Sequence, residues 1–243
     1  MNCVLSHSSE FAGSWHTQRN MPSDGEPQLV LWGHAWYRSG RNVWMLEELG
    51  VPFTHRPVRA RTADVETAEF KAVSPRGKIP VLQDGDFSLT ESAAINTYLC
   101  DHYGQSTGFV PPAGTRMRAV YDSWLFTITT ELDAQGLYIH RKHVGLAHIY
   151  GEAPTAVEAA RAYFLKQLGS VQAVLRSSPS ILGSDAPSTF TAADLLLTDV
   201  LVWARNLSWL PEDDEALADY IARNTARPAY QRAAASAQAS PTG

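Results

Sequence analysis

The sequence has few features of a disulfide scaffold, a membrane protein or a nucleic-acid-binding protein. Only two cysteines occur in 243 residues, Cys3 and Cys100, and they lie far apart and outside any C-x-x-C pattern. This spacing excludes a disulfide framework, a zinc site of the usual cysteine type and a dithiol redox motif. No apolar run approaches the roughly 20 residues that a membrane-spanning helix needs. The formal charge of −5 leaves no basic surplus to neutralise phosphates, which argues against nucleic acid as the main partner.

The first 27 residues also lack a secretory signal. They are rich in Ser, His, Gly and Pro, with no sustained apolar segment behind a basic start. We therefore expect residues 1–27 to form a flexible leader outside the fold. With so little cysteine, the reducing cytoplasm is the expected compartment, and Cys100 is expected to be a packed thiol.

What is present is an ordinary globular composition, with 44% hydrophobic and 19% charged residues. The length suffices for one large domain or two modest ones, each with its own core. No internal repeat is visible.

Residues 74–95 hold more special-purpose residues than any other stretch. Ile79-Pro80 stands at the entrance to a short strand, where a proline removes no ladder hydrogen bond. Asp84-Gly85 lies between two apolar runs and predicts a hairpin turn with positive φ at both central residues. Thr90 is a candidate N-cap for the helix that follows.

Glu91 and Ser92 then fall in the first turn of that helix. Free N–H groups and the positive helix end attract a carboxylate, the Ser92 hydroxyl adds a donor, and Glu91 supplies the opposite charge. The pair is suited to a zwitterionic amino-acid head group. The alternative is that Thr90 and Glu91 only cap the helix and complement its dipole.

Taken whole, this string resembles the glutathione transferase family. The first domain of that family carries a P-x-G-x-(V/I)-P-x-L segment, a short hairpin and then E-S-x-A-I-x-x-Y-L. The matching residues here are Pro75, Gly77, Ile79, Pro80, Leu82, Glu91, Ser92, Ala94, Ile95, Tyr98 and Leu99. The resemblance extends in weaker form over residues 28–230, and within the family it is nearest to soluble bacterial members of the serine type.

The elements predicted around this string agree with that resemblance. Residues 28–32 and 53–58 read as strands, with a helix between them that ends at Gly50, and a weaker helix covers residues 65–73. This order indicates a small mixed sheet covered by helices. The resemblance implies a thioredoxin-like α/β domain over residues 28–104, with a cis Ile79-Pro80 bond.

The second half reads as entirely helical. A Gly- and Pro-containing linker covers residues 105–115, and an all-helical C-terminal domain is expected over residues 116–235. Its helical segments are residues 116–144, residues 154–175, a helix opened by a capping pair of Thr191 and Asp194, and residues 213–223. After Pro228 the sequence consists mainly of Ala, Ser and Gln, so residues 236–243 are expected to form a flexible tail.

The resemblance implies that this enzyme binds glutathione and lowers the pKa of its thiol, so that a thiolate attacks an electrophilic carbon. Glu91 and Ser92 are then expected to hold the γ-glutamyl end. Ile79, shaped by Pro80, is expected to pair its backbone with the cysteinyl residue, and Lys78 to lie near the glycine carboxylate. For Lys78 the alternative is a solvated loop residue.

The residue that activates the thiol is less clear, because the chain departs from the family pattern here. Serine-type members that share Trp-x-Leu-Glu-Glu-Leu-Gly place the serine about four residues before the arginine that matches Arg41, and this chain has Tyr37 there. Tyr37 is one candidate and Ser39 is another, although Ser39 also reads as a helix N-cap. A backbone N–H is the third possibility. Residues 32–43 contain no cysteine, which argues against a mixed disulfide with the enzyme.

The electrophile site is expected between the domains. Candidates to line it are Tyr121, Trp124, Tyr138 and the run at residues 139–143, although aromatic residues at helical spacing more often belong to a core. His140, His143 and His148 have no carboxylate or cysteine at ligand spacing, so no metal is expected.

The sequence therefore predicts a cytoplasmic glutathione S-transferase that uses glutathione as a substrate against a small hydrophobic electrophile. The family implies a homodimer, and no nucleic acid or membrane partner is expected. A non-catalytic relative that uses the same fold as a binding or assembly module is the alternative from another class. A glutathione-dependent isomerase, peroxidase or dehalogenase would differ only in the electrophile.

Overall fold

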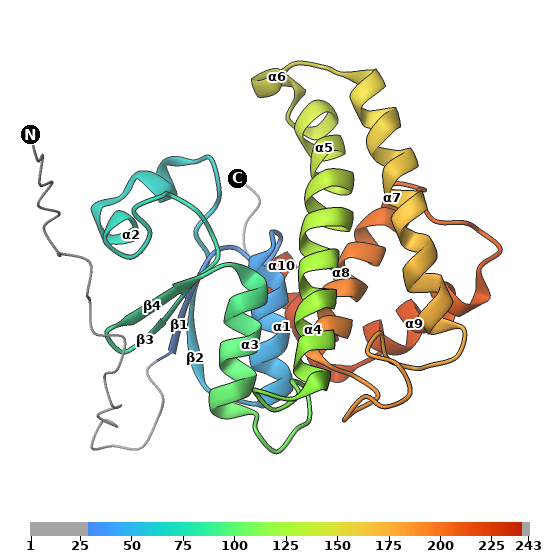
Figure 1. Ribbon diagram of the computed structural model, residues 1–243. Coiled ribbons are helices and arrows are strands. Elements are labelled where there is room, and N and C mark those ends of the chain that lie inside the picture. Colours follow the sequence, from blue (N-terminus) through green and yellow to red (C-terminus); the bar gives the residue numbers. More distant parts are fainter. Residues whose placement is uncertain (1–28, 240–243) are drawn as a thin grey trace, which may run out of the picture.

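The structure of the protein is a computed structural model, and it describes residues 29–239 (Figure 1). The predicted leader at residues 1–27 lies outside the described residues, as does the end of the chain from residue 240 onwards. The remainder forms a sheet-containing part followed by helices alone, which confirms the predicted fold class.

The sheet has four short strands, in the spatial order β2-β1-β3-β4. β1 (Leu29–Trp32) pairs parallel with β2 (Phe53–Arg56) and antiparallel with β3 (Val81–Asp84), which in turn pairs antiparallel with β4 (Phe87–Thr90). Because side chains alternate along a strand, Leu29 and Leu31 face the main core while Trp32 joins a smaller cluster on the other face.

Helices cover both faces of this sheet. α1 (Ser39–Leu49) joins the two parallel strands and ends at Gly50, whose φ of 62° gives the left-handed C-cap expected from the sequence. α3 (Ser92–Tyr103) lies beside α1 (Figure 1). On the opposite face, η1 (Ala63–Glu66) and α2 (Ala68–Val73) bury Val65 and Phe70.

The hairpin between β3 and β4 is confirmed, but its turn differs from the prediction. Asp84 pairs with Phe87, so the two turn residues are Gly85 and Asp86. Only Gly85 has a positive φ, of 61°. The register moves the turn one residue later, because Asp84 still belongs to the ladder and its carboxylate accepts from Tyr98, 2.7 Å away. The Ile79-Pro80 bond is cis, as predicted.

The helical domain begins with one long, irregular helical column. Its parts are α4 (Arg116–Phe126), η2 (Thr127–Leu137), α5 (Tyr138–His140) and η3 (Arg141–Gly145), of which η2 and η3 are π-helical. Figure 1 shows this column standing between the first domain and α7 (Pro154–Leu175). π-Helical turns are often found at functional sites. α6 (Ala147–Tyr150) follows the column at its far end.

The remaining helices complete the core. α8 (Ala192–Asn206) opens with the predicted capping box, in which Thr191 and Asp194 bond to each other's backbone N–H. α9 (Glu215–Thr225) follows, and the chain ends its described part in α10 (Pro228–Ala239). A single apolar cluster runs through α1, α3, α4, η2, α7, α8, α9 and α10, so the two domains share one core.

The chain after residue 235 corrects the sequence prediction. The sequence predicts a flexible tail over residues 236–243, whereas α10 continues as a helix to Ala239. Ala229 and Ala233 are buried, and Trp44 of α1 lies edge-on to Tyr230 at a centroid distance of 4.8 Å. Small residues let α10 pack closely on α1, and that contact stabilises a helix with little amphipathic signal of its own.

No helix among residues 29–239 is both long and apolar enough to cross a membrane.

Candidate functional site

The loop that leads into β3 is held by its own side chains. Ser74 is buried, and its hydroxyl donates to the carbonyl of Lys78 at 2.8 Å and accepts from the Lys78 N–H at 3.1 Å. These two hydrogen bonds fix the backbone just before the cis Ile79-Pro80 bond. Pro80 is buried, Ile79 is half-buried and the Lys78 side chain is exposed.

Glu91 is the N-cap of α3, and its backbone is unusual. Its φ of 71° lies in a region that residues with a Cβ rarely adopt, and such outliers gather at functional sites. This position corrects the prediction that Thr90 caps the helix, because Thr90 still belongs to β4. The Glu91 side chain is 76% exposed and pairs with Arg76 at 3.3 Å.

Ser92 is the first residue of α3 and is buried, so the helix begins one residue later than the sequence predicts. Asn42 of α1 donates to the Ser92 carbonyl at 2.9 Å and to Asn96 at 2.7 Å. The start of α3 is therefore fixed to α1. This connection holds the Glu91–Ser92 turn in a constant position relative to the segment that contains Tyr37.

The segment between β1 and α1 carries the two predicted activating residues. His34 is buried, its Nδ1 accepts from the N–H of Trp36 at 3.1 Å, and its carbonyl accepts from the N–H of Tyr37 at 3.1 Å. Burial, followed by electrostatic interaction with His55 and Arg59, lowers the pKa of His34 below its usual value. Tyr37 is half-buried, with its ring edge-on to His34.

Ser39 lies deeper than Tyr37. It is fully buried, and its hydroxyl is one of two buried side-chain polar atoms in residues 29–239 without a hydrogen-bond partner. It packs against Gly33, where a Cβ would meet Ser39 Oγ at 2.1 Å and Ile79 Cβ at 3.1 Å. Ser39 is also not the N-cap, since Arg38 holds that position. The Ser39 hydroxyl therefore lies close to Ile79, but other atoms of the protein cover it.

A cavity of about 710 Å³ lies between the two domains. The first domain contributes the segment from Ala35 to Arg41 with Trp44, and the helical domain contributes residues of α5, η3, α8 and α10. Trp36 and Val144 both line it, and both are exposed apolar residues. Exposed apolar side chains gathered at a cavity are typical of a ligand site.

Ion pairs join the domains at the wall of this cavity. Arg41 of α1 is 1% exposed and donates to Asp133 of η2 at 2.8 Å and to Asp199 of α8 at 2.6 Å. Arg38 also pairs with Asp133, with one N–H···O distance of 2.8 Å. Although burial acts in the opposite direction, Arg41 and Arg38 keep the pKa of Asp133 below its usual value. The pairs fix the α1 entry segment against the helical domain.

Two predicted electrophile-site residues do not reach this cavity. Tyr121 is fully buried in the core, where its hydroxyl bonds to Thr97 at 2.8 Å, and burial raises its pKa. Trp124 packs against the core cluster. Neither residue lines this cavity, because α4 turns both side chains toward the core. From the run at residues 139–143, His140 and Arg141 do line the cavity.

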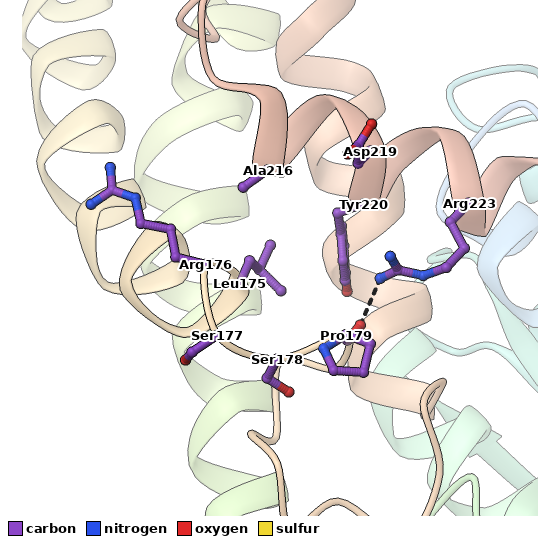
Figure 2. Close-up of a pocket in the computed structure, with 9 residues that line it drawn as sticks. All are labelled: Leu175, Arg176, Ser177, Ser178, Pro179, Ala216, Asp219, Tyr220 and Arg223. Atoms are coloured by element: carbon purple, nitrogen blue, oxygen red, sulfur yellow. Dashed lines mark hydrogen bonds between the residues drawn. The ribbon is translucent and has the colours of Figure 1, made fainter.

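A second cavity, of about 440 Å³, lies in the helical domain (Figure 2). It is bordered by the end of α7, the following loop and α9, and Arg223 donates across it to the carbonyl of Pro179 at 2.7 Å. The Tyr220 hydroxyl turns away to Asp194 at 2.8 Å. No predicted site residue lines this cavity. Within residues 29–239, no three His, Cys, Asp or Glu side chains are grouped as a metal site.

Sequence reasoning missed the partners that α8 and α10 bring to the cavity. Trp203 and Tyr230 line it together with Asp199. It also missed Arg61, which has a φ of 63° and reaches from the loop after β2 to the hydroxyl of Tyr138 at 3.2 Å. No local signal marks such residues, because their neighbours in space are distant in sequence.

A thioredoxin-like domain with a cis-proline edge, followed by a helical domain and an interdomain cavity, defines the structural class. The family description "Glutathione S-transferase, N-terminal domain" matches residues 38–102. Glutathione S-transferase GstA of Escherichia coli O157:H7 is 31% identical over 193 residues, which are 77% of this chain and 88% of that protein. The chain therefore belongs to the glutathione S-transferase family.

Solved structures agree with this assignment. A glutathione transferase from Methylococcus capsulatus matches with a TM-score of 0.72 and 29% identity, over 86% of this chain and 98% of that one. The theta-class glutathione S-transferase of Xanthomonas axonopodis pv. citri, solved with glutathione bound, matches with a TM-score of 0.70 and 27% identity, over 85% and 97% of the two chains.

Proposed function

We propose that the protein conjugates the thiolate of glutathione to a small hydrophobic electrophile held in the interdomain cavity. The observation that carries this proposal is the half-buried phenol of Tyr37 at the wall of a cavity of about 710 Å³. The cis-proline edge and the α3 start are presented by the same domain, with Glu91 and Ser92 at that start. The related structure from Xanthomonas axonopodis pv. citri carries glutathione, which supports glutathione as the substrate here.

In this mechanism Glu91 and Ser92 hold the γ-glutamyl end, Ile79 pairs with the cysteinyl backbone beside Pro80, and Lys78 lies near the glycine carboxylate. The thiol loses its proton to solvent, and the Tyr37 hydroxyl donates a hydrogen bond to the sulfur, which favours the anion. The thiolate then forms a C–S bond with the electrophilic carbon. For an aryl halide, the C–X bond breaks and the halide leaves with the bonding pair.

We prefer Tyr37 over Ser39 as the hydrogen-bond donor to the glutathione sulfur, because Tyr37 is the more exposed of the two residues. Tyr37 lines the cavity, whereas Ser39 has no exposed surface through which a bound sulfur can be reached. The orphaned Ser39 hydroxyl is better explained as a polar atom that packs closely under Gly33.

The test is the pKa of the bound thiol, read from thiolate absorbance during a pH titration of glutathione with the protein. We expect a shift to lower pH, which Tyr37→Phe reduces together with an about 10- to 100-fold loss of kcat/KM for an aryl halide, the usual range for a hydrogen bond to a charged group. Tyr121→Phe is the matched control, because it removes a hydroxyl in the core.

Ser39→Ala is tested in parallel and is expected to keep the thiol shift. If Tyr37→Phe keeps full turnover and Ser39→Ala loses it, the roles assigned here are wrong. Glutathione that binds with an unshifted thiol, and with no turnover, would instead support a non-catalytic binding or assembly module.

We further propose a homodimer in the cytoplasm. Membership of the family supports the dimer, and sedimentation velocity of the full chain tests it. Cys100 is buried, and burial raises the pKa of its thiol to about 12, which suits a packed, unreactive thiol in a reducing compartment.

A further inference from the structure

The wall of the interdomain cavity carries more positive than negative charge. Three arginines line it, Arg38, Arg41 and Arg141, against one carboxylate, Asp199. Arg38 and Arg41 are neutralised by Asp133 and Asp199. Arg141 has no ion pair with any carboxylate in residues 29–239. The excess charge of the cavity therefore resides on Arg141.

Arg141 is held by aromatic rings instead of a carboxylate. Its guanidinium carbon lies 5.3 Å from the centroid of the Tyr37 ring and 6.0 Å from that of Tyr138. Such contacts position a cation without neutralising it. The Arg141 guanidinium is thus held beside Tyr37, the proposed thiol-activating residue. Its N–H groups remain available to donate hydrogen bonds to a ligand.

Two further cations lie close to Arg141. Arg61 donates to the hydroxyls of Tyr138 and Tyr150 at 3.2 and 3.4 Å, and Lys142 lies 5.1 Å from the centroid of the Tyr150 ring. Neither has an ion pair among the described residues. Burial, and then repulsion from Arg61 and Arg38, lowers the pKa of Arg141. Like charges gathered in a partly desolvated site favour the binding of an anion.

We propose that the cavity beside Tyr37 takes electrophiles that carry a carboxylate, which the guanidinium of Arg141 binds. The aromatic and apolar wall, with Trp36 and Trp203, receives the body of the molecule, and the carboxylate pairs with Arg141, the arginine of the cavity wall that has no carboxylate partner among the described residues. Arg61 and Lys142 do not line the cavity, and their positive charges add longer-range attraction for an anion. This inference rests on the proposed transferase function and narrows its substrate class.

A matched pair of aryl chlorides tests it, 4-chloro-3,5-dinitrobenzoate and its neutral methyl ester. In both, the thiolate sulfur bonds to the carbon that bears chlorine, chloride leaves with the bonding pair, and the thiol proton passes to solvent. Each kcat/KM is divided by its uncatalysed rate, so that only enzyme preference is compared. We expect the wild-type protein to prefer the carboxylate about tenfold or more, the size expected for a charge-assisted hydrogen bond.

Variants then assign the preference to one residue. Arg141→Gln is expected to reduce the carboxylate-to-ester ratio about tenfold, and Arg141→Lys to retain part of it, because the charge remains without the fork. Arg176→Gln, at the second cavity, is the matched control and is expected to keep the wild-type ratio (Figure 2). An equal ratio in wild type and Arg141→Gln would overturn the proposal. So would a rise in the KM for glutathione alone, which would assign Arg141 to the glycine carboxylate of glutathione.

Binding of an unreactive analogue separates this inference from the proposed function. Quenching of tryptophan fluorescence by 3,5-dinitrobenzoate and by its methyl ester is measured without turnover. If neither chloride is converted but the carboxylate binds better, and Arg141→Gln abolishes the difference, the anion subsite stands and the transferase proposal falls. If the chlorides are converted without preference, the transferase stands and the subsite is refuted.

Discussion

Replacing Asp133 by Asn removes the charge at the centre of the interdomain ion pairs. Asp133 is 2% exposed and Arg41 is 1% exposed, so water cannot take over the lost interaction. Breaking a buried pair from one side typically costs about 3–5 kcal/mol, because the remaining charge stays buried. Arg41 keeps Asp199 at 2.6 Å, which places the expected loss at the lower end, about 3 kcal/mol.

Urea unfolding followed by tryptophan fluorescence measures this loss, and the seven tryptophans provide the signal. For a chain of this size, about 3 kcal/mol corresponds to a fall in Tm of roughly 6–12 °C. The matched control is Asp122→Asn. Asp122 is 48% exposed and lies 3.6 Å from Arg118, so its loss is expected to stay within about 0.5 kcal/mol.

The pH dependence gives a second, signed test of the same residue. Because the folded pKa of Asp133 is below the unfolded value of about 3.9, its stabilisation is present above that value and is lost as pH falls through the folded pKa. The difference in stability between wild type and Asp133→Asn should therefore shrink below about pH 4. A loss no larger than that of Asp122→Asn, with no change on acidification, would refute the reasoning.

Three further substitutions test the packing around the site by urea unfolding. Asp194→Ala should lower the free energy of unfolding by about 3–5 kcal/mol, because the buried N–H groups of Thr191 and Ile181, 2.8 and 2.7 Å from the Asp194 carboxylate, lose their acceptor. The control Asp214→Ala, at the N-cap of α9, should lower it by only about 1 kcal/mol. Equal losses for the two variants would contradict this prediction. Gly136→Ala should destabilise the protein by about 1–3 kcal/mol, because the new Cβ would lie 2.9 Å from Phe164. Gly169→Ala, where a Cβ would meet nothing within 4 Å, should stabilise it by up to about 1 kcal/mol. Changes of the opposite sign would refute this prediction. Arg227→Gln should lower the free energy of unfolding by about 2 kcal/mol, because it removes two hydrogen bonds to Glu48, at 2.6 and 2.8 Å. Amide hydrogen exchange in α10 should become faster. An unchanged exchange rate in α10 would contradict this prediction.

The sequence by itself determined the features that depend on a few neighbouring residues. The hairpin after Pro80, the Thr191 capping box and the bounds of α7 follow from turn, capping and periodicity rules. The same rules predict the helix after the hairpin, although it begins at Ser92, one residue later than expected. These rules act over short stretches, so the family string at residues 74–99 could be recognised and its fold expected. Even here the turn was displaced by one residue, because strand register decides where a ladder ends.

Only the tertiary structure decided what lines the cavity and what fixes it. Arg38 meets Asp133 across 95 positions of the chain, and Arg227 meets Glu48 across 179. No local pattern encodes such pairs. The same holds for α10, whose small residues become helical against α1, and for Tyr121, which helical spacing alone could not assign to core or cavity. Arg141 was one of several residues in a candidate run, and its unpaired charge beside Tyr37 emerged only when the two domains were placed together.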